Sequence, residues 1–202
     1  FEYIYFARLD SKIDNISVYE ARIRGGATLA KTYPVDADLV CGVPDSGLAS
    51  AKGYSEESGI PFGLAFHKNS YVGRTFIKPT QKERESSVKI KLSVLESVVK
   101  GKRIVLVDDS IVRGTTISNL ITMLRKAGAT EVHVRISSPP FLYPCYFGTD
   151  VPSNKQLIAS SHSTEEIRQQ IGADSLGYMP IEELQNMVGD LPICRACFDS
   201  HY

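Results

Sequence analysis

The sequence predicts an α/β fold with a mainly parallel sheet flanked by helices. Short apolar runs bounded by turn residues, such as residues 39–43 and 104–107, alternate with longer segments of helical character. A helical pattern over about residues 115–126 joins the second run to a third at residues 132–136, which is the order of a βαβ unit. With 202 residues and 43% hydrophobic composition, the chain can bury a core of its own.

The first helix is expected over residues 18–32. Ser17 and Glu20 form a candidate capping box at its start, although Gly25 and Gly26 weaken its middle. The first strand, residues 39–43, ends at a turn of small residues, and a second helix then continues to about Ser58.

A second strand is expected at residues 62–66, followed by a long polar segment, residues 67–87, that is rich in Lys and Arg. Loops of this length are uncommon in a compact domain unless they are functional. Residues 89–100 predict a short helix that leads into the strand at residues 104–107.

The pattern changes to short pieces after Pro139 and Pro140. Ser163 and Glu166 form another candidate capping box, for a helix that ends near Ile171, and a further helix is expected to begin near Pro180. We therefore expect a core over residues 1–140 and a helical or irregular C-terminal appendage over residues 141–202.

The balanced charge argues against several partners. The 23 basic and 23 acidic residues cancel, so the composition indicates neither nucleic acid nor an anionic membrane as partner. No stretch approaches the roughly 20 apolar residues of a membrane helix, and the N-terminus has no signal pattern. The sequence thus predicts a cytoplasmic protein. It opens without methionine on an apolar run, residues 1–6, and we expect it to be a fragment.

The strongest chemical signal lies in residues 104–116. Four apolar residues predict a buried strand, so Asp108 and Asp109 emerge at its carboxyl end, where open α/β sheets bind ligands. The stretch that follows supplies hydroxyls and amides at a helix N-terminus, whose partial positive charge suits a phosphate monoester. The expected substrate-binding residues here are Asp108, Asp109, Ser110, Val112, Arg113, Gly114, Thr115 and Thr116.

This segment resembles the phosphoribosylpyrophosphate-binding motif of type I phosphoribosyltransferases. Residues 1–11, 43–47 and 68–77 and the C-terminal cysteine pattern further resemble the amidophosphoribosyltransferase family, and the resemblance covers nearly the whole chain. It departs at Leu9, where members often carry proline, and at the variable positions Cys41 and Gly47.

The resemblance implies a type I phosphoribosyltransferase fold and assigns roles to two further loops. Pro44, Asp45, Ser46 and Gly47 would form the pyrophosphate loop, and Ser46 would place Mg²⁺ together with Asp108 and Asp109. Lys68, Arg74 and Lys78, with Gly73 as a hinge, would belong to a flexible catalytic loop that closes over the substrate.

The implied reaction is displacement of pyrophosphate from C1 of 5-phosphoribosyl 1-pyrophosphate by ammonia. The product is 5-phosphoribosylamine, and the reaction is the first step of purine synthesis. Family members produce the ammonia from glutamine in an N-terminal glutaminase domain, which nothing in this sequence resembles. Purine nucleotides as feedback inhibitors and a homo-oligomeric state are further expectations from the resemblance.

The cysteines carry a second metal hypothesis. Cys194 and Cys197 have the C-x-x-C spacing of metal or redox sites. By resemblance they would, with Cys145, provide three of the four ligands of a [4Fe–4S] cluster, and the fourth would precede Phe1. Reduced structural cysteines and a zinc site are the alternatives, and Cys41 is expected to be a core residue.

Other functions fit the sequence less well. No Gly-x-Gly-x-x-Gly follows the first strand, which argues against a dinucleotide-binding oxidoreductase. A non-enzymatic nucleotide sensor with the same pocket would predict a nucleic-acid-binding surface, which the neutral composition does not indicate. The four histidines form no metal-spaced cluster, and none is given a catalytic role.

Overall fold

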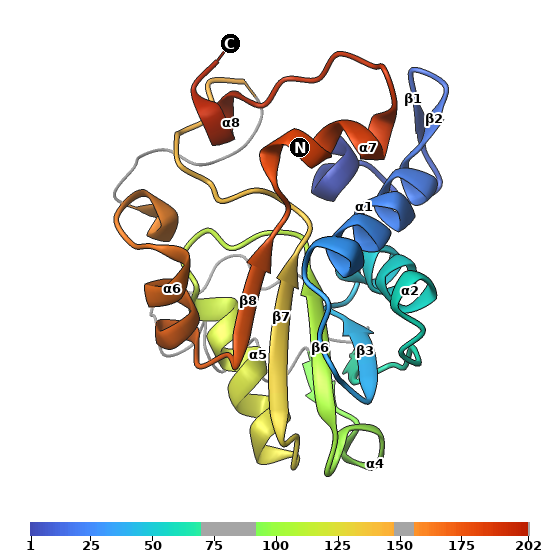
Figure 1. Ribbon diagram of the computed structural model, residues 1–202, viewed down its shortest axis with the longest axis vertical. Coiled ribbons are helices and arrows are strands. Elements are labelled where there is room, and N and C mark those ends of the chain that lie inside the picture. The colour runs from blue at the N-terminus through green and yellow to red at the C-terminus, as the bar shows by residue number, and fades with distance from the viewer. Residues whose placement is uncertain (70–91, 148–155, 202) are drawn as a thin grey trace.

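The protein is built around one parallel four-stranded sheet with the strand order β3-β6-β7-β8 (Figure 1). The computed structural model describes residues 1–69, 92–147 and 156–201. The strands are β3 (Leu39–Gly42), β6 (Arg103–Asp108), β7 (Glu131–Ile136) and β8 (Ser175–Tyr178), and every neighbouring pair is parallel. The expected α/β fold is confirmed.

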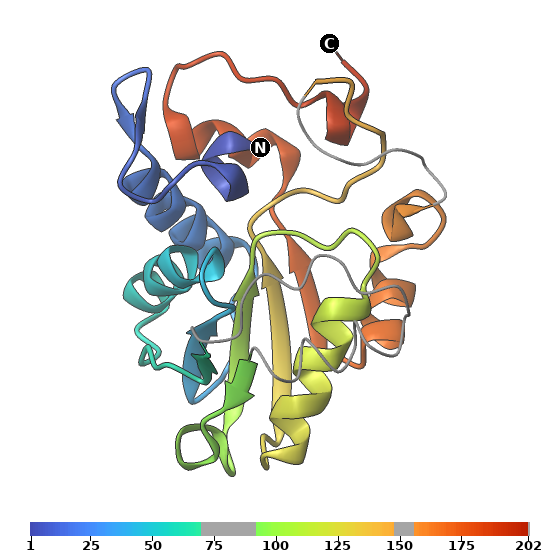
Figure 2. The same cartoon turned by 180° about the vertical axis from the view of Figure 1, so that it is seen from behind.

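Helices cover both faces of this sheet, as the two opposite views in Figures 1 and 2 show. On one face lie α1 (Val18–Thr32) and α2 (Gly47–Ser58), and on the other lie α5 (Thr115–Lys126) and α6 (Thr164–Ile171). Successive residues of β6 alternate between the two layers, because side chains of a strand point to opposite faces. A sheet covered on both sides accounts for the near-continuous apolar run of β6.

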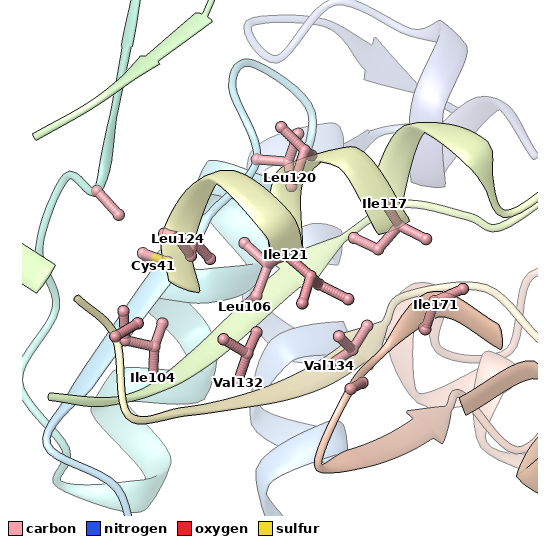
Figure 3. Close-up of a cluster of buried hydrophobic side chains, with 14 of the residues drawn as sticks. Cys41, Ile104, Leu106, Ile117, Leu120, Ile121, Leu124, Val132, Val134 and Ile171 are labelled. Atoms are coloured by element: carbon pink, nitrogen blue, oxygen red, sulfur yellow. The ribbon is translucent and has the colours of Figure 1, made fainter. Parts of the chain in front are cut away.

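The larger core lies between the sheet and α5 (Figure 3). Leu106 and Val134 from neighbouring strands pack beneath Ile121 and Leu124 of the helix. Cys41 belongs to the same cluster and is fully buried, which confirms its expected role as a small core residue.

The two glycines in α1 lie where this helix meets its neighbours. A Cβ atom on Gly26 would lie 1.8 Å from the carbonyl oxygen of Ser50 in α2. Reciprocally, a Cβ on Gly53 would lie 2.0 Å from the carbonyl oxygen of Ile23. The two helix backbones therefore touch, and the residues that lower intrinsic helix propensity permit this contact.

Shorter elements complete the described chain. A π-helical turn, η1, opens it, and a small antiparallel hairpin precedes α1, with Asp14 and Asn15 at positive φ in its turn. The elements are η1 (Glu2–Phe6), β1 (Lys12–Ile13), β2 (Ile16–Ser17), α4 (Glu96–Val99), η3 (Ile158–Ser160), η4 (Ile181–Leu184), α7 (Gln185–Val188) and α8 (Ala196–Asp199).

Two expected elements differ from the structure. The strand predicted at residues 62–66 is wrong, because Phe62 makes only an isolated bridge to Val40. The pairing begins later, where β4 (Phe66–Lys68) and β5 (Leu92–Val94) form a separate antiparallel sheet. Residues 89–91 of the helix predicted over residues 89–100 lie outside the described residues. Residues 92–94 form a strand in which burial follows a two-residue period, and the chain becomes helical only in α4.

Strand β8 was not predicted from the sequence. This strand has four residues, two of them Ser and Gly, which have low strand propensity. Gly177 is needed there because a Cβ would lie 2.7 Å from the ring of Tyr33. The fourth strand of the main sheet therefore comes from the region after residue 140.

The expected helix starts are found in part. Ser163 and Glu166 form a complete capping box at α6, whereas at α1 the Ser17 hydroxyl accepts a bond from the Glu20 amide without the reciprocal bond. The helix expected near Pro180 begins as the 3₁₀ turn η4 and continues into α7. Across the described ranges, no helix combines the length and apolar character needed to span a membrane.

Candidate functional site

A cleft of about 1230 Å³ opens at the carboxyl ends of β3 and β6. Both loops that the sequence singled out line it. The predicted residues in its lining are Pro44, Asp45, Ser46, Lys68, Asp108, Asp109, Ser110, Val112, Arg113, Gly114, Thr115 and Thr116. Gly47 lies behind this surface, where a Cβ would be 2.4 Å from the carbonyl oxygen of Val107. The parallel sheet thus brings together loops that are far apart in the sequence.

Hydrogen bonds order the carboxylates at the end of β6. The Ser46 hydroxyl donates to Oδ2 of Asp109 at 2.5 Å, and the Ser110 hydroxyl donates to Oδ1 at 2.6 Å. The backbone amide of Asp109 donates to Oδ1 of Asp108 at 2.9 Å. Asp109 is therefore held by one hydroxyl from each of the two loops.

Asp108 and Asp109 are both buried, with 7% and 9% of their surface exposed. Burial raises the pKa of Asp108 well above the usual value, and the adjacent charge of Asp109 raises it further. Two adjacent buried carboxylates favour a bound cation that neutralises their charge. Carboxylate oxygens are groups that Mg²⁺ prefers to coordinate. The donor set at this strand end therefore fits a magnesium ion shared with a phosphorylated substrate.

The first turn of α5 forms another side of the cleft. Gly114 precedes the helix at a φ of 79°, a conformation that glycine adopts without strain. Among the described residues no side chain caps the turn, and Thr115 and Thr116 line the cleft. Uncapped amides and the helix dipole suit an anion such as a phosphate monoester.

The C-terminal region contributes a wall that sequence reasoning missed. The amide of Ile158 donates to the carbonyl of Val112 at 2.9 Å, and the Arg113 guanidinium hydrogen-bonds the side chain of Gln156. Gln156 itself lines the cleft. Nothing in the local sequence marks this glutamine as a site residue.

The N-terminal segment forms a further part of the cleft lining, which was also missed as part of the site. Phe1, Tyr5, Phe6, Ala7, Arg8, Leu9 and Asp10 line the cleft, together with Phe141 and the buried Arg22. Tyr5, Phe6 and Leu9 are 40–47% exposed, although they are apolar. The signal available in the sequence was the group of aromatic residues in the opening run. Their exposure in the structure is typical of an interaction site.

The basic residues predicted for catalysis are only partly described. Lys68 at the end of β4 forms an ion pair with Asp45 of the predicted pyrophosphate loop, and both line the cleft. Arg74 and Lys78, together with Gly73, lie outside the described residues.

The C-terminal cysteines lie near the start of the chain. The carbonyl of Cys197 accepts bonds from the amides of Leu142 and Tyr143, each at 3.1 Å, which brings the segment around Cys145 to α8. The ring of Phe141 lies 5.0 Å from that of Phe1 and 5.1 Å from that of Phe198, measured between centroids.

The thiols influence one another electrostatically. Burial raises the pKa of Cys197 to about 11; the chain's amino terminus opposes this rise, whereas Cys145 and Cys194 add to it. In the three described ranges, however, no group of three or more His, Cys, Asp or Glu side chains is arranged to hold a metal ion.

A scan against protein families identifies residues 14–137 as a phosphoribosyl transferase domain. Among curated proteins, the chain is 56% identical over 202 residues to an amidophosphoribosyltransferase of Methanocaldococcus jannaschii. It is 55% identical over 207 residues to the Bacillus subtilis protein of that name. These alignments cover 100% of this chain but 43% and 44% of the relatives, so the chain spans less than half of their length.

Two solved structures have the same fold over the whole chain. One is described as the allosteric regulatory enzyme of purine biosynthesis, and the other as glutamine phosphoribosylpyrophosphate amidotransferase from B. subtilis complexed with ADP and GMP. Each has a TM-score of 0.90 and 54% identity, and this chain covers 44% and 46% of them, respectively. Because the family match includes both cleft loops up to Thr116, the chain belongs to the phosphoribosyl transferase domain family.

Proposed function

We propose that this chain binds 5-phosphoribosyl 1-pyrophosphate and transfers its phosphoribosyl group to ammonia. The observation that carries this proposal is the arrangement of Asp108 and Asp109 beside the uncapped N-terminus of α5 in one cleft. A sugar phosphate has hydroxyls for the acids and a phosphate for the amides, and the cleft offers both at adjacent positions. The names of the relatives support ammonia as the acceptor.

Each part of the cleft has a defined task in this reaction. Thr115, Thr116 and the first amides of α5 bind the 5-phosphate, while Asp108 and Asp109 accept hydrogen bonds from the ribose hydroxyls. The loop from Pro44 to Ser46 lies beside the leaving pyrophosphate. Bound Mg²⁺, held by Ser46, Asp108 and Asp109 together with the substrate, would neutralise charge on the pyrophosphate.

The basic side chains would assist the leaving group. Lys68 forms an ion pair with Asp45. When substrate enters, the Lys68 ammonium can exchange this carboxylate for the pyrophosphate as its partner. We propose the same electrostatic role for Arg74 and Lys78. No strong general base is needed, since neutral ammonia is already a nucleophile.

The wider setting is proposed from the relatives. Because they are more than twice as long as this chain, a glutaminase domain that channels ammonia would lie in the remaining length. Purine nucleotides are proposed as inhibitors, since a similar protein was solved with ADP and GMP. We further propose that the protein forms a homo-oligomer and that it is located in the cytoplasm.

We also propose that Cys145, Cys194 and Cys197 bind a [4Fe–4S] cluster with a fourth cysteine upstream of Phe1. Thiolates are the usual ligands of such clusters. The contacts of Cys197 with the segment before Cys145 support the proposal, as does the edge-to-face contact of Phe1 with Phe141. A cluster there would tie the C-terminal tail to the chain start and supply no step of the transfer.

The test of the proposed function combines binding with turnover. Asp108→Asn with Asp109→Asn should abolish calorimetric binding of the magnesium complex of the substrate, with secondary structure unchanged by circular dichroism. The unmodified chain should form 5-phosphoribosylamine from ammonium salts at raised pH, and should not use glutamine. Unchanged affinity in the double variant would contradict the site assignment. Binding without turnover would favour the nucleotide-sensor alternative.

A further inference from the structure

Arg22 is a buried cation whose hydrogen bonds go to the main chain. It projects from α1 and is 4% exposed, and its hydrogen bonds to described residues go to three main-chain carbonyl groups. A buried guanidinium carries a large desolvation cost unless its donors are satisfied. Burial lowers the pKa of Arg22, and the negative charge of Asp109 opposes that effect. Arg22 therefore lies within electrostatic reach of the proposed magnesium ligand.

Three carbonyl groups of the N-terminal segment satisfy this side chain. Nε donates to Tyr3 at 2.8 Å, and Nη2 donates to Tyr5 at 3.1 Å and to Ala7 at 2.9 Å. The acceptors belong to η1 and to the residue that ends it. One planar fork on α1 thus fixes the position of a whole turn.

The turn that Arg22 holds is a wall of the cleft. Tyr5, Phe6 and Leu9 line the cleft with apolar surface, and the buried Arg22 also lines it. The acids and the phosphate loop line the same cleft. The apolar wall and the residues proposed to bind the substrate therefore enclose one common space.

We infer that Arg22 is a positioning residue for the transfer, because it fixes the N-terminal wall over the cleft through three main-chain hydrogen bonds. This inference rests on the proposed function. Arg22 contacts neither the substrate nor the reacting atoms, and it acts through the segment that it holds.

A displaced wall has a defined chemical consequence. In the transfer, the bond from C1 to the pyrophosphate oxygen breaks, a bond to the ammonia nitrogen forms, and that nitrogen then loses a proton. Water can attack the same carbon, giving ribose 5-phosphate and pyrophosphate. When the apolar wall moves, more water reaches C1, and the ratio of hydrolysis to amination rises.

The experiment compares two arginines of the same helix in the complete polypeptide that carries these residues. Arg24 also donates to a main-chain carbonyl, that of Met187 at 3.0 and 2.6 Å, but it does not line the cleft. The variants are Arg22→Met, Arg22→Lys, Arg24→Met and Arg24→Lys. Amine and ribose 5-phosphate are measured with ammonium salts, and thermal unfolding selects conditions in which each variant is folded.

For Arg22→Met we expect kcat/KM for ammonia to fall by about 10- to 100-fold. Hydrolysis should rise relative to amination, while KM for phosphoribosylpyrophosphate changes little because its loops are intact. Arg22→Lys should show the same shift in smaller measure, since one ammonium cannot reproduce the fork. If Arg22→Met does not fold, Arg22→Lys alone is compared with the Arg24 variants. Both Arg24 variants should keep the wild-type product ratio.

Two outcomes would overturn the inference: equal product ratios in the Arg22 and Arg24 variants, or a wild-type ratio in Arg22→Lys, which would mean that charge alone matters. Failure of the proposed function is recognised separately, because the wild-type protein would then form no amine from the substrate and ammonium salts.

Discussion

The hydroxyl of Ser46 donates a hydrogen bond to the carboxylate of Asp109, which lies 63 positions later in the chain. One residue starts α2 after strand β3, and the other follows the neighbouring strand β6. The bond therefore joins the two loops that the proposed reaction needs, one for pyrophosphate and one for the ribose phosphate. It also fixes the orientation of Asp109 before any ligand arrives.

Removal of this hydroxyl should weaken substrate binding. We expect Ser46→Ala to reduce affinity for the magnesium complex of phosphoribosylpyrophosphate by at least about tenfold, because a hydrogen bond to a charged group contributes about 1.5–3 kcal/mol. Titration calorimetry measures this effect. Ser55→Ala is the matched control, since Ser55 also lies in α2 but bonds to the carbonyl of Ile60 away from the cleft. Equal affinities of both variants would contradict the role of Ser46.

Substitution of Asp108 should stabilise the fold at neutral pH in the absence of magnesium. Its folded-state pKa is raised by burial and by Asp109, so the stability associated with its proton is present below the unfolded pKa of about 3.9. That stability is lost as the pH rises through the higher folded-state value. We expect Asp108→Asn to raise the free energy of unfolding by about 1–2 kcal/mol at pH 7.

The sign of this effect is checked by urea unfolding in chelator from pH 4 to pH 8. The advantage of Asp108→Asn should grow with pH. Asp38→Asn should instead lower stability by a nearly constant amount across this range, because hydrogen bonds from Arg103 lower the pKa of Asp38 to about 2. The stability that its charge contributes is lost only below about pH 4. A constant difference between Asp108→Asn and the wild type across the range would refute the explanation.

The adjacent glycines of α1 should respond differently to alanine. Gly26→Ala should lower the free energy of unfolding by about 2 kcal/mol or more, because its Cβ would overlap the backbone of Ser50 in α2. Gly25→Ala should be neutral or stabilising by up to about 1 kcal/mol, since its Cβ would meet only the flexible end of Met187, 3.1 Å away. Chemical denaturation measures the free energy of unfolding of both variants. Equal values for the two would mean that α1 and α2 can move apart to accommodate the added Cβ atom.

The cluster proposal predicts iron in a protein that includes the upstream cysteine. Anaerobically purified protein should contain iron and labile sulfide and absorb visible light. Cys194→Ser with Cys197→Ser should remove all three signals. Cys41→Ser should retain them, because Cys41 is buried in the sheet core. Stoichiometric zinc without iron or sulfide would favour the zinc alternative.

Local patterns predicted the elements whose signals are contained in a short segment. The apolar run of β6 followed by two acids predicted both a buried strand and a ligand-binding strand end, and Ser163 with Glu166 predicted the start of α6. These features depend on neighbours within a few residues, so the sequence displays them directly.

Features that depend on distant partners were not predictable in this way. β8 is specified by pairing with β7 and by the ring of Tyr33 against Gly177, and nothing within four residues signals either contact. Gln156 and Arg22 reach the cleft only because the fold brings their segments to it. The apolar residues at 62–66 resembled a strand, but Phe62 found a single bridging partner.

The parallel pairing of β7 with β8 has a practical consequence for any shortened version of this protein. A chain cut after residue 140 would lose β8, and the backbone groups of β7 that bond to it would be left without partners at the edge of the sheet. Such an open sheet edge is a template for pairing with other chains. Truncation at that point should therefore yield a protein that self-associates, although its phosphate-binding loop would be complete.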